Sequence, residues 1–243
     1  MTIHRVSPAA DRRGYGHAVG ILLLDHSAPA VPGDVLNARS FEYPVAYRYV
    51  EGLTVDRVFA GDPDCEPLVV AASRELEAMG VGGISTNCGF LLRYQDAVAR
   101  AVRVPVFLSS LLQLPLIAAG TGRTRPIGLV VANAAALRND LLERSGVPME
   151  TPLVVADLAD RPEFRRCFLD QCGELDRDRM ERETVEAARG LVEREPDVAA
   201  ILLECAVLPA YAAAVQRATG RPTFDFMTLI DFFHGAQHRR AYH

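Results

Sequence analysis

Two cysteines, Cys88 and Cys205, occupy matching positions in two similar stretches of this sequence. Residues 81–107 align without a gap on residues 198–224, at the constant offset of 117 positions that separates the cysteines. The identical pairs of greatest weight are Cys88 with Cys205, Tyr94 with Tyr211, Pro105 with Pro222 and Phe107 with Phe224. A lone cysteine is more often a packing residue than a reactive one. Because packing does not explain a matched pair, the repeat predicts a chemical role for both thiols.

Two thiols that face each other can transfer protons on opposite faces of one carbon atom. One thiolate removes a proton from carbon while the opposite thiol returns a proton, which inverts a stereocentre. A free thiol has a pKa of ~8.5, and the N-terminus of a helix favours its thiolate form. The backbone N–H groups after each cysteine, with Asn87 and nearby hydroxyl groups, are candidate donors to the developing enolate. The pair therefore predicts acid–base catalysis by Cys88 and Cys205.

Alternating strand and helix patterns surround both cysteines. Residues 19–24 (VGILLL) and 127–131 (IGLVV) are apolar throughout, as buried parallel strands are. Amphipathic helical patterns at 66–79 and 175–194 precede the two cysteine strands, and helical patterns also follow the cysteines. Each half then closes with a short strand that begins at a proline, 105-PVFL and 222-PTFDF. This alternation predicts parallel α/β sheets.

We expect two α/β lobes related by an approximate two-fold axis, each a parallel sheet flanked by helices, with the active site in the cleft between them. The expected segments are a flexible arm (1–16), a first lobe (17–120), a second lobe (121–225) and a C-terminal helix (226–243) that packs back on the first lobe. In such sheets ligands bind beyond the carboxyl ends of the strands. Both cysteines directly follow such an end, so they are expected at the cleft.

The residues around the two cysteines resemble the aspartate/glutamate racemase superfamily. The resemblance is carried by Thr86-Asn87-Cys88-Gly89 after one strand, and by Glu204-Cys205 with Pro209 and Tyr211 after another. The order of strands and cysteines matches over residues 17–235, and the runs 31-VPGD, 109-SSLLQLP and 228-TLI resemble an uncharacterised branch. Members include glutamate, aspartate and hydantoin racemases, maleate isomerase and arylmalonate decarboxylase, and they work without pyridoxal phosphate. The resemblance implies Cys88 and Cys205 as the acid–base residues and places Asp25 beside the site.

The sequence departs from the glutamate racemases directly after each cysteine. Those enzymes have Asn-Thr after the first cysteine and Thr-His after the second, whereas this chain has Gly89-Phe90 and Ala206-Val207. The Cys-Ala pair is closer to the hydantoin racemases. The hydroxyl and imidazole contacts of the glutamate racemases are therefore missing here.

Seven further residues are candidates for substrate binding, and each also has a purely structural interpretation. The candidates are Asp25, Asn87, Gly89, Ser109, Ser110, Ala206 and Thr228. Asp25 can equally be a strand-end cap, Asn87 can satisfy the backbone of its turn, and the hydroxyl groups can cap helices. Glu204 can likewise satisfy the backbone of its turn, and Tyr94 and Tyr211 are expected in the core, on helix faces.

Composition limits the other function classes. The chain has 243 residues, 49% of them hydrophobic, and a net charge of −5, which gives no indication of a nucleic-acid partner. Its apolar runs are too short or too interrupted for a membrane span, and its first residues lack a signal peptide, so we expect a cytoplasmic protein. Five cysteines, an odd number, are expected as free thiols. Cys167 and Cys172 lack the partners of a zinc site, and we expect no metal or cofactor.

The sequence therefore predicts a cofactor-independent racemase or epimerase of an amino acid or related small carboxylate. An isomerase of the maleate isomerase type and a hydantoin racemase are alternatives within the fold. A ligand-binding module without turnover is the alternative from another class, and a redox pair is a third. A homodimer is compatible with the superfamily, while the substrate is left open.

Overall fold

The computed structural model of this protein describes residues 14–239 and residue 241. Its strands are β1 (Val19–Leu23), β2 (Val45–Tyr49), β3 (Ile84–Thr86), β4 (Ile127–Val131), β5 (Leu153–Asp157), β6 (Ala200–Leu203) and β7 (Thr223–Phe224). Its helices are α1 (Val55–Ala60), α2 (Cys65–Ala78), α3 (Gln95–Ala101), α4 (Leu114–Gly120), α5 (Asn139–Arg144), α6 (Pro162–Phe164), α7 (Arg177–Arg194), α8 (Ala212–Thr219) and α9 (Phe226–Gln237). Short helical turns are η1 (Ala38–Ser40), η2 (Gly89–Tyr94), η3 (Ser110–Gln113), η4 (Arg165–Leu169) and η5 (Leu208–Tyr211).

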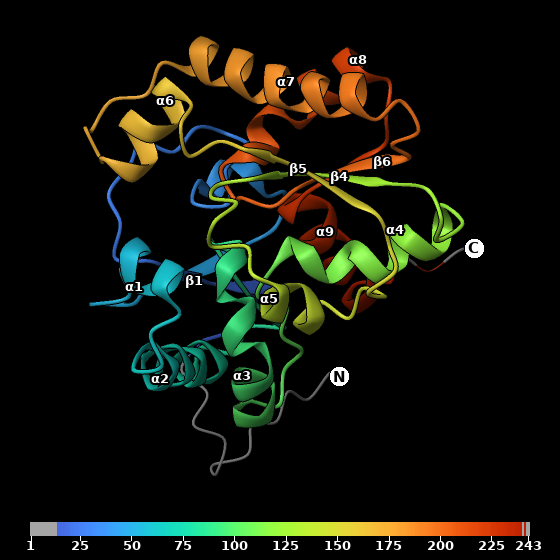
Figure 1. The fold of residues 1–243 in the computed structure, drawn as a ribbon. Helices are drawn as coiled ribbons and strands as arrows, with labels where there is room; N and C mark the ends of the chain where they lie inside the picture. The colour runs from blue at the N-terminus through green and yellow to red at the C-terminus, as the bar shows by residue number, and fades with distance from the viewer. Residues whose placement is uncertain (1–13, 240, 242–243) are drawn as a thin grey trace.

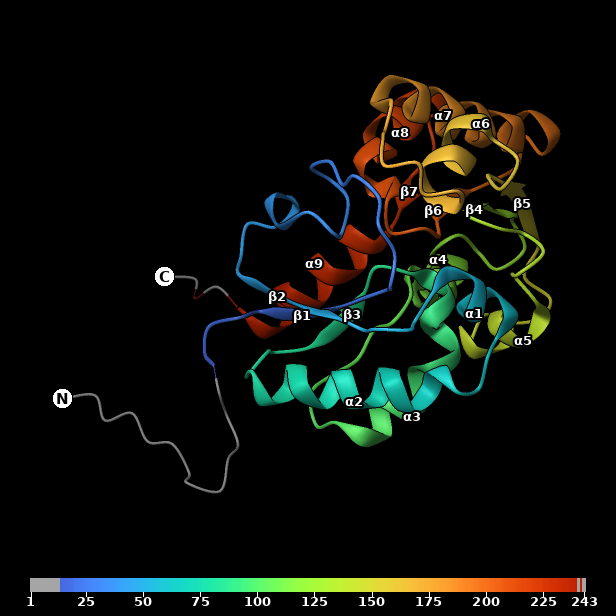
Figure 2. The same ribbon diagram turned by 90° about the vertical axis from the view of Figure 1, so that its left-hand side faces the viewer.

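Two parallel sheets form the centres of two lobes (Figures 1 and 2). The first sheet has the order β2-β1-β3 and the second has the order β5-β4-β6-β7. Every neighbouring pair of strands is parallel. The α/β fold with two helix-flanked parallel sheets, predicted from the strand patterns, is confirmed.

The sequence repeat corresponds to a repeat of strand pairing. In the first lobe Ile84 pairs in parallel with Val106, and in the second Ile201 pairs in parallel with Thr223. Ile201 follows Ile84 by 117 positions and Thr223 follows Val106 by the same number, which is also the separation of the two cysteines. After each cysteine comes a short turn, η2 or η5, and then a helix, α3 or α8. The two cysteines therefore occupy equivalent places in the two halves.

Helices cover the sheets with the faces that their apolar spacing predicts. The buried residues of α2 are Cys65, Val69, Ala72, Ser73 and Leu76, at helical spacing, and this face packs on the first sheet. Helix α7 covers the second sheet and contacts β4 and β5. These helices begin and end within two residues of the predicted ranges, 66–79 and 175–194. Helix α7 begins two residues later than predicted because Asp176 caps it: the Asp176 side chain accepts the N–H of Arg179.

Helix α9 follows the last strand of the second lobe but packs on the first sheet, on the face opposite α2 (Figure 2). Its Phe226 and Ile230 join Val19 and Ile21 of β1 in one apolar cluster. The ring of Phe233 lies 4.7 Å from that of Phe107. Helix α9, near the end of the described chain, is therefore packed against β1, near its beginning.

The predicted arm, residues 1–16, lies outside the described residues up to position 13. The predicted lobe boundaries remain predictions. Among the described helices, none combines the length and the apolar character needed to cross a membrane.

Candidate active site

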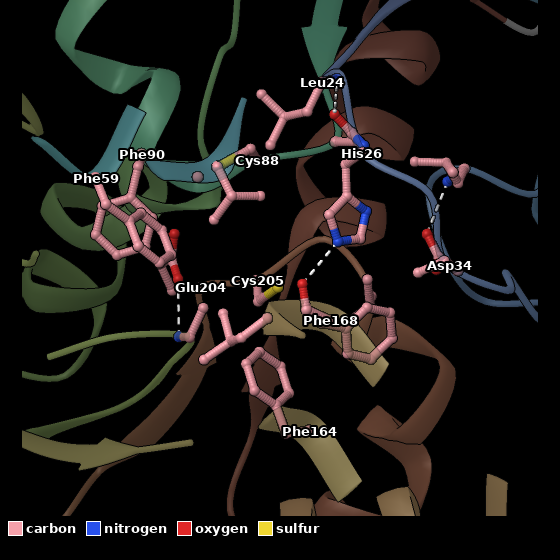
Figure 3. Close-up of a pocket in the computed structure, with 18 residues that line it drawn as sticks. Leu24, His26, Asp34, Phe59, Cys88, Phe90, Phe164, Phe168, Glu204 and Cys205 are labelled. Atoms are coloured by element: carbon pink, nitrogen blue, oxygen red, sulfur yellow. Dashed lines mark hydrogen bonds between the residues drawn. The ribbon is translucent and has the colours of Figure 1, made fainter. Parts of the chain in front are cut away.

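A pocket lies between the two lobes, at the carboxyl ends of β1, β3, β4 and β6 (Figure 3). Its empty volume is about 580 Å³, its open mouth included. The first lobe contributes Leu24, His26, Asp34, Phe59 and residues 87–90, and the second contributes Ala132, Phe164, Phe168, Glu204 and Cys205. Both predicted catalytic cysteines therefore line one pocket, each from its own lobe.

Cys88 is held at the turn where β3 ends and η2 begins. The hydroxyl group of Thr86 accepts the N–H of Cys88 at 2.7 Å and donates to the carbonyl oxygen of Cys88 at 3.1 Å. Burial raises the pKa of the Cys88 thiol to about 12, and the neighbouring Glu204 carboxylate acts in the same direction. The backbone N–H groups of Phe90 and Leu91 donate toward the thiol and oppose this shift.

Cys205 stands in the corresponding turn after β6. Burial raises the pKa of its thiol well above the ordinary value, and Glu204 adds to the effect. The N–H of Val207 donates toward the sulfur and opposes the shift. The backbone donors at the start of each turn thus favour the thiolates as expected, but burial outweighs them and both pKa values stay raised. All five cysteines are free, as predicted.

Asn87 and Gly89 are the two predicted binding residues that line the pocket. The Asn87 side-chain oxygen accepts the N–H of Leu24 at 2.9 Å, which joins the ends of β1 and β3. Gly89 packs against the second lobe, since a Cβ atom at this position would lie 2.1 Å from Oε1 of Glu204. A glycine is needed here for close approach between the lobes.

Asp25 is not among the residues that line the pocket. Its carboxylate accepts the hydroxyl group of Tyr49 and, at 2.9 Å, the N–H of Gly52. These two bonds lower the pKa of Asp25. Asp25 thus stands between two lining residues, Leu24 and His26, but its carboxylate is bound to the loop after β2. Its role at the site remains a prediction.

The three predicted hydroxyl residues also lie off the pocket lining. Ser109 caps η3 by accepting the N–H of Leu111 at 3.1 Å. Ser110 donates to the carbonyl oxygens of Leu203 and Glu204, at 3.1 and 3.2 Å. Both serines satisfy backbone groups, although Ser110 does so at the strand that carries Cys205.

Thr228 and Ala206 are similarly occupied. Thr228 forms a reciprocal cap with Asp225 at the start of α9, and its hydroxyl group donates to Gln113. Ala206 is fully buried, and its carbonyl oxygen accepts the N–H of Val35 at 3.1 Å. Neither residue lines the pocket.

Two acidic residues of the pocket, Asp34 and Glu204, were missed as site residues. Both are buried, at 2% and 0% exposure. Burial raises the pKa of Asp34 to about 7 and that of Glu204 to about 8. The repeat held a signal for Glu204, because it aligns with Asn87 directly before a matched cysteine. Asp34 belongs to the VPGD run and had no comparable signal.

Aromatic side chains form two walls of the pocket (Figure 3). The rings of Phe59 and Phe90 meet edge to face at 4.9 Å, and those of Phe164 and Phe168 lie 5.3 Å apart. A ring nitrogen of His26 lies 2.7 Å from the carbonyl oxygen of Phe168, which links the lobes beside the pocket. The two pairs of rings come from distant parts of the sequence, so no local spacing predicted that they line one pocket.

The pocket lining has no lysine or arginine in the part of the chain that the structure describes. Its ionisable groups besides the two thiols are Asp34, Glu204 and His26, and its walls are apolar or aromatic. Such a lining suits a cationic group, which aromatic faces and carboxylates attract. Among the described residues, no cluster of three or more His, Cys, Asp or Glu could hold a metal ion.

No family model matches this chain. Dimethylsulfoniopropionate lyase 7 of Emiliania huxleyi (strain CCMP1516) is 34% identical over 226 residues, which are 89% of this chain and 66% of that protein. Dimethylsulfoniopropionate lyase 3 of the same strain is 35% identical, but the chain spans only 58% of its length. The dimethylsulfoniopropionate lyase of Durusdinium sp. clade D is 33% identical over 223 residues, 89% of this chain and 73% of that protein.

Among solved structures, unliganded arylmalonate decarboxylase superimposes with a TM-score of 0.57 at 17% identity, over 93% of this chain and 97% of that chain. Allantoin racemase from Pseudomonas fluorescens gives a TM-score of 0.54 at 13% identity, over 90% of each chain. Aspartate racemase from Picrophilus torridus gives a TM-score of 0.51 at 12% identity, over 93% of this chain and 96% of that chain. At these identities the likeness shows the fold, which is the one that the sequence resemblance implied.

Proposed function

This chain belongs to the family of the dimethylsulfoniopropionate lyases and has the fold of the aspartate/glutamate racemase superfamily, and we propose that it cleaves the carbon–sulfur bond of dimethylsulfoniopropionate or a closely similar sulfonium carboxylate. The observation that carries the proposal is the composition of the pocket. Two cysteine thiols lie between aromatic walls and buried carboxyl groups, without a lysine or arginine in the described lining.

The proposed reaction is an elimination that begins as a racemisation would. A cysteine sulfur removes the proton from the carbon next to the substrate carboxylate. The C–H electron pair then forms the carbon–carbon double bond, and the C–S electron pair leaves with dimethyl sulfide. Acrylate is the second product. The backbone N–H groups that follow the cysteines, such as that of Val207, are the proposed donors to the developing negative charge.

The pocket walls support a sulfonium substrate over an acidic amino acid. A sulfonium group carries a positive charge on an apolar body, which Phe59 and Phe168 can contact from two sides. The second carboxylate of glutamate or aspartate would meet Asp34 and Glu204 instead. That arrangement is unfavourable, because like charges repel strongly where water is excluded.

The first test is product formation. Purified protein with dimethylsulfoniopropionate should release dimethyl sulfide and acrylate in equal amounts. Gas chromatography measures the dimethyl sulfide, and proton NMR measures the acrylate. Cys88→Ser and Cys205→Ser should each lower turnover by at least about 100-fold, as expected on loss of an acid–base group. Cys172→Ser is the matched control, because Cys172 is exposed and lies off the pocket lining. Full turnover in both pocket variants would end the proposal.

Racemisation or epimerisation of a small carboxylate is the second candidate. The observation that favours it is that both thiols line the pocket from opposite lobes, whereas elimination needs proton removal on one face only. In deuterated water a racemase exchanges the α-hydrogen without losing a group, and NMR distinguishes this from elimination. A covalent cysteine adduct would instead indicate an isomerase, and stabilisation without turnover would indicate a binding module. The compartment and the oligomeric state remain predictions.

A further inference from the structure

Glu204 has a carboxyl group that the fold buries without fully satisfying it. Oε2 accepts a long hydrogen bond, 3.3 Å, from the N–H of Ala132. Oε1 is buried and has no hydrogen-bond partner among the described residues. An unpaired buried carboxyl oxygen costs stability. The side chain therefore has a position that stability alone does not explain.

The surrounding structure holds this carboxyl group between the two cysteine turns. Glu204 directly precedes Cys205, and its Oε1 packs against Gly89, which directly follows Cys88. Ser110 donates to the carbonyl oxygen of Glu204 and so fixes the backbone from the first lobe. Figure 3 shows Glu204 beside the pocket that both thiols line. One carboxyl group is thus shared by two reactive positions.

Several charged groups act on this cluster. The Glu204 carboxylate raises the pKa of both thiols, and Arg93 partly opposes the effect at Cys88. Asp34 acts on Cys205 and lines the same pocket, as does His26. The described lining has no lysine or arginine that could hold Glu204 in its ionised form. Glu204 and the thiols are therefore coupled, so their protons are lost in steps that belong to the group as a whole.

We infer that the Glu204 carboxylate accepts the proton of a cysteine thiol and so forms the thiolate that takes the α-hydrogen of the substrate. The inference rests on the proposed function, because it assigns a residue to the same proton transfer. The thiol S–H bond breaks and its proton passes to the Glu204 carboxylate, while the sulfur takes the α-hydrogen and becomes a thiol again. The C–H electron pair forms the double bond and the C–S pair leaves with dimethyl sulfide. Glu204, now a neutral carboxylic acid, returns its proton to water when the products leave.

The direct test measures thiol reactivity without any substrate. The rate of iodoacetamide alkylation is followed at Cys88 and at Cys205 by peptide mass spectrometry, from about pH 6 to about pH 10. If one negative charge is shared with Glu204, the wild-type rate rises and then levels near pH 8, where the carboxyl group has ionised. In Glu204→Gln, which keeps the size of the side chain, the rate should rise through the whole range. The exposed Cys172 is the internal reference.

A wild-type profile without a bend near pH 8 would overturn the inference, and so would the same bend in Glu204→Gln. These outcomes do not depend on which substrate the protein accepts. A wild-type protein that shows the bend but never converts dimethylsulfoniopropionate would refute the proposed lyase activity while supporting the coupling of Glu204 to the thiols.

Kinetics of Glu204→Gln test the catalytic use of the coupling. We expect kcat to fall by about 10²–10⁴-fold, well beyond any change in KM, and the limb near pH 8 to disappear from the pH profile of kcat. A variant with unchanged kcat and an unchanged limb would contradict the inference.

Thermal unfolding tests whether Glu204 gains a charge inside the folded protein or serves only as a packing group. The folded-state pKa of Glu204, about 8, lies above its ordinary value of 4.5, so its contribution to stability is present below pH 4.5 and is lost as pH rises through 8. The Tm of the wild type should therefore fall relative to Glu204→Gln over this range. A Tm difference that is independent of pH would contradict the inference. If Glu204→Gln does not fold, the wild-type alkylation profile decides alone.

Discussion

At the scale of single residues, the pocket is built around weak acids kept neutral by burial. The thiols of Cys88 and Cys205 and the carboxyl group of Glu204 all have raised pKa values. No counter-charge in the described lining lowers them again. Proton transfer there costs little rearrangement, because the groups that exchange the proton are already packed together. Close packing of this kind depends on Gly89, which leaves space for the Glu204 carboxyl group.

Replacing Gly89 by alanine should therefore disturb both stability and activity. The new Cβ atom would lie 2.1 Å from Oε1 of Glu204, so the carboxyl group or the η2 turn must shift. Overpacking of this kind costs about 1–3 kcal/mol, measurable as a lower free energy of unfolding in urea. Lyase turnover should fall as well. Gly120→Ala is the matched control, because its Cβ would meet no atom within 4 Å. A Gly89→Ala protein as stable and active as wild type would contradict this account.

At the scale of elements, polar residues at strand ends serve mainly to start helices and join strands. The Asp225–Thr228 cap begins α9, and Gln113 of η3 is bound to both residues. This cap directs the chain from the second lobe back onto the first sheet. Thr228 thus acts on the position of a helix rather than on the pocket.

Thr228→Ala should accordingly reduce stability without changing substrate affinity. Loss of the cap is expected to lower the free energy of unfolding by about 1 kcal/mol. KM for dimethylsulfoniopropionate should stay at the wild-type value, because Thr228 does not line the pocket. The exposed Thr124→Ala serves as the control for loss of a threonine hydroxyl group. A raised KM with unchanged stability would restore Thr228 as a substrate-binding residue.

At the scale of the whole molecule, the pocket exists only because two similar lobes face each other. Phe59 comes from the first lobe and Phe168 from the second, and the bond between His26 and Phe168 links them beside the pocket. Each lobe also supplies one thiol and one buried carboxyl group. The proposed recognition of a cation is therefore a property of the assembled fold.

Binding of substrate analogues tests this property without catalysis. A propionate with a trimethylammonium group should bind more tightly than the same propionate with a neutral tert-butyl group, by about tenfold in calorimetry. The difference should grow as pH rises through about 7 and about 8, because ionised Asp34 and Glu204 attract the cation. Phe168→Leu should reduce this difference in affinity, because it removes one aromatic face from the pocket. Equal affinities at every pH would argue against a cationic substrate.

The sequence by itself determined the framework and the equivalent positions of the two cysteines. Apolar runs and helical spacing predicted the strands and the two long helices, because these patterns depend only on neighbouring residues. The repeat around Cys88 and Cys205 predicted two equivalent strand ends, which the matching register of Ile84 and Ile201 confirms. Prediction of the cysteine pair needed no tertiary contact, since a duplicated unit carries its own alignment.

Only the tertiary structure decided which other side chains reach the pocket. Asp25 and Thr228 looked equivalent to site residues in the sequence, yet neither lines the pocket, and each is bound to a backbone or side-chain group of the protein. Asp34 and Phe168 come from segments that no pattern connected with the cysteines, and they reach the pocket through the meeting of the lobes. The physical reason is that a polar side chain at a strand end bonds to the nearest unpaired donor. Which donor is nearest depends on how distant segments pack together.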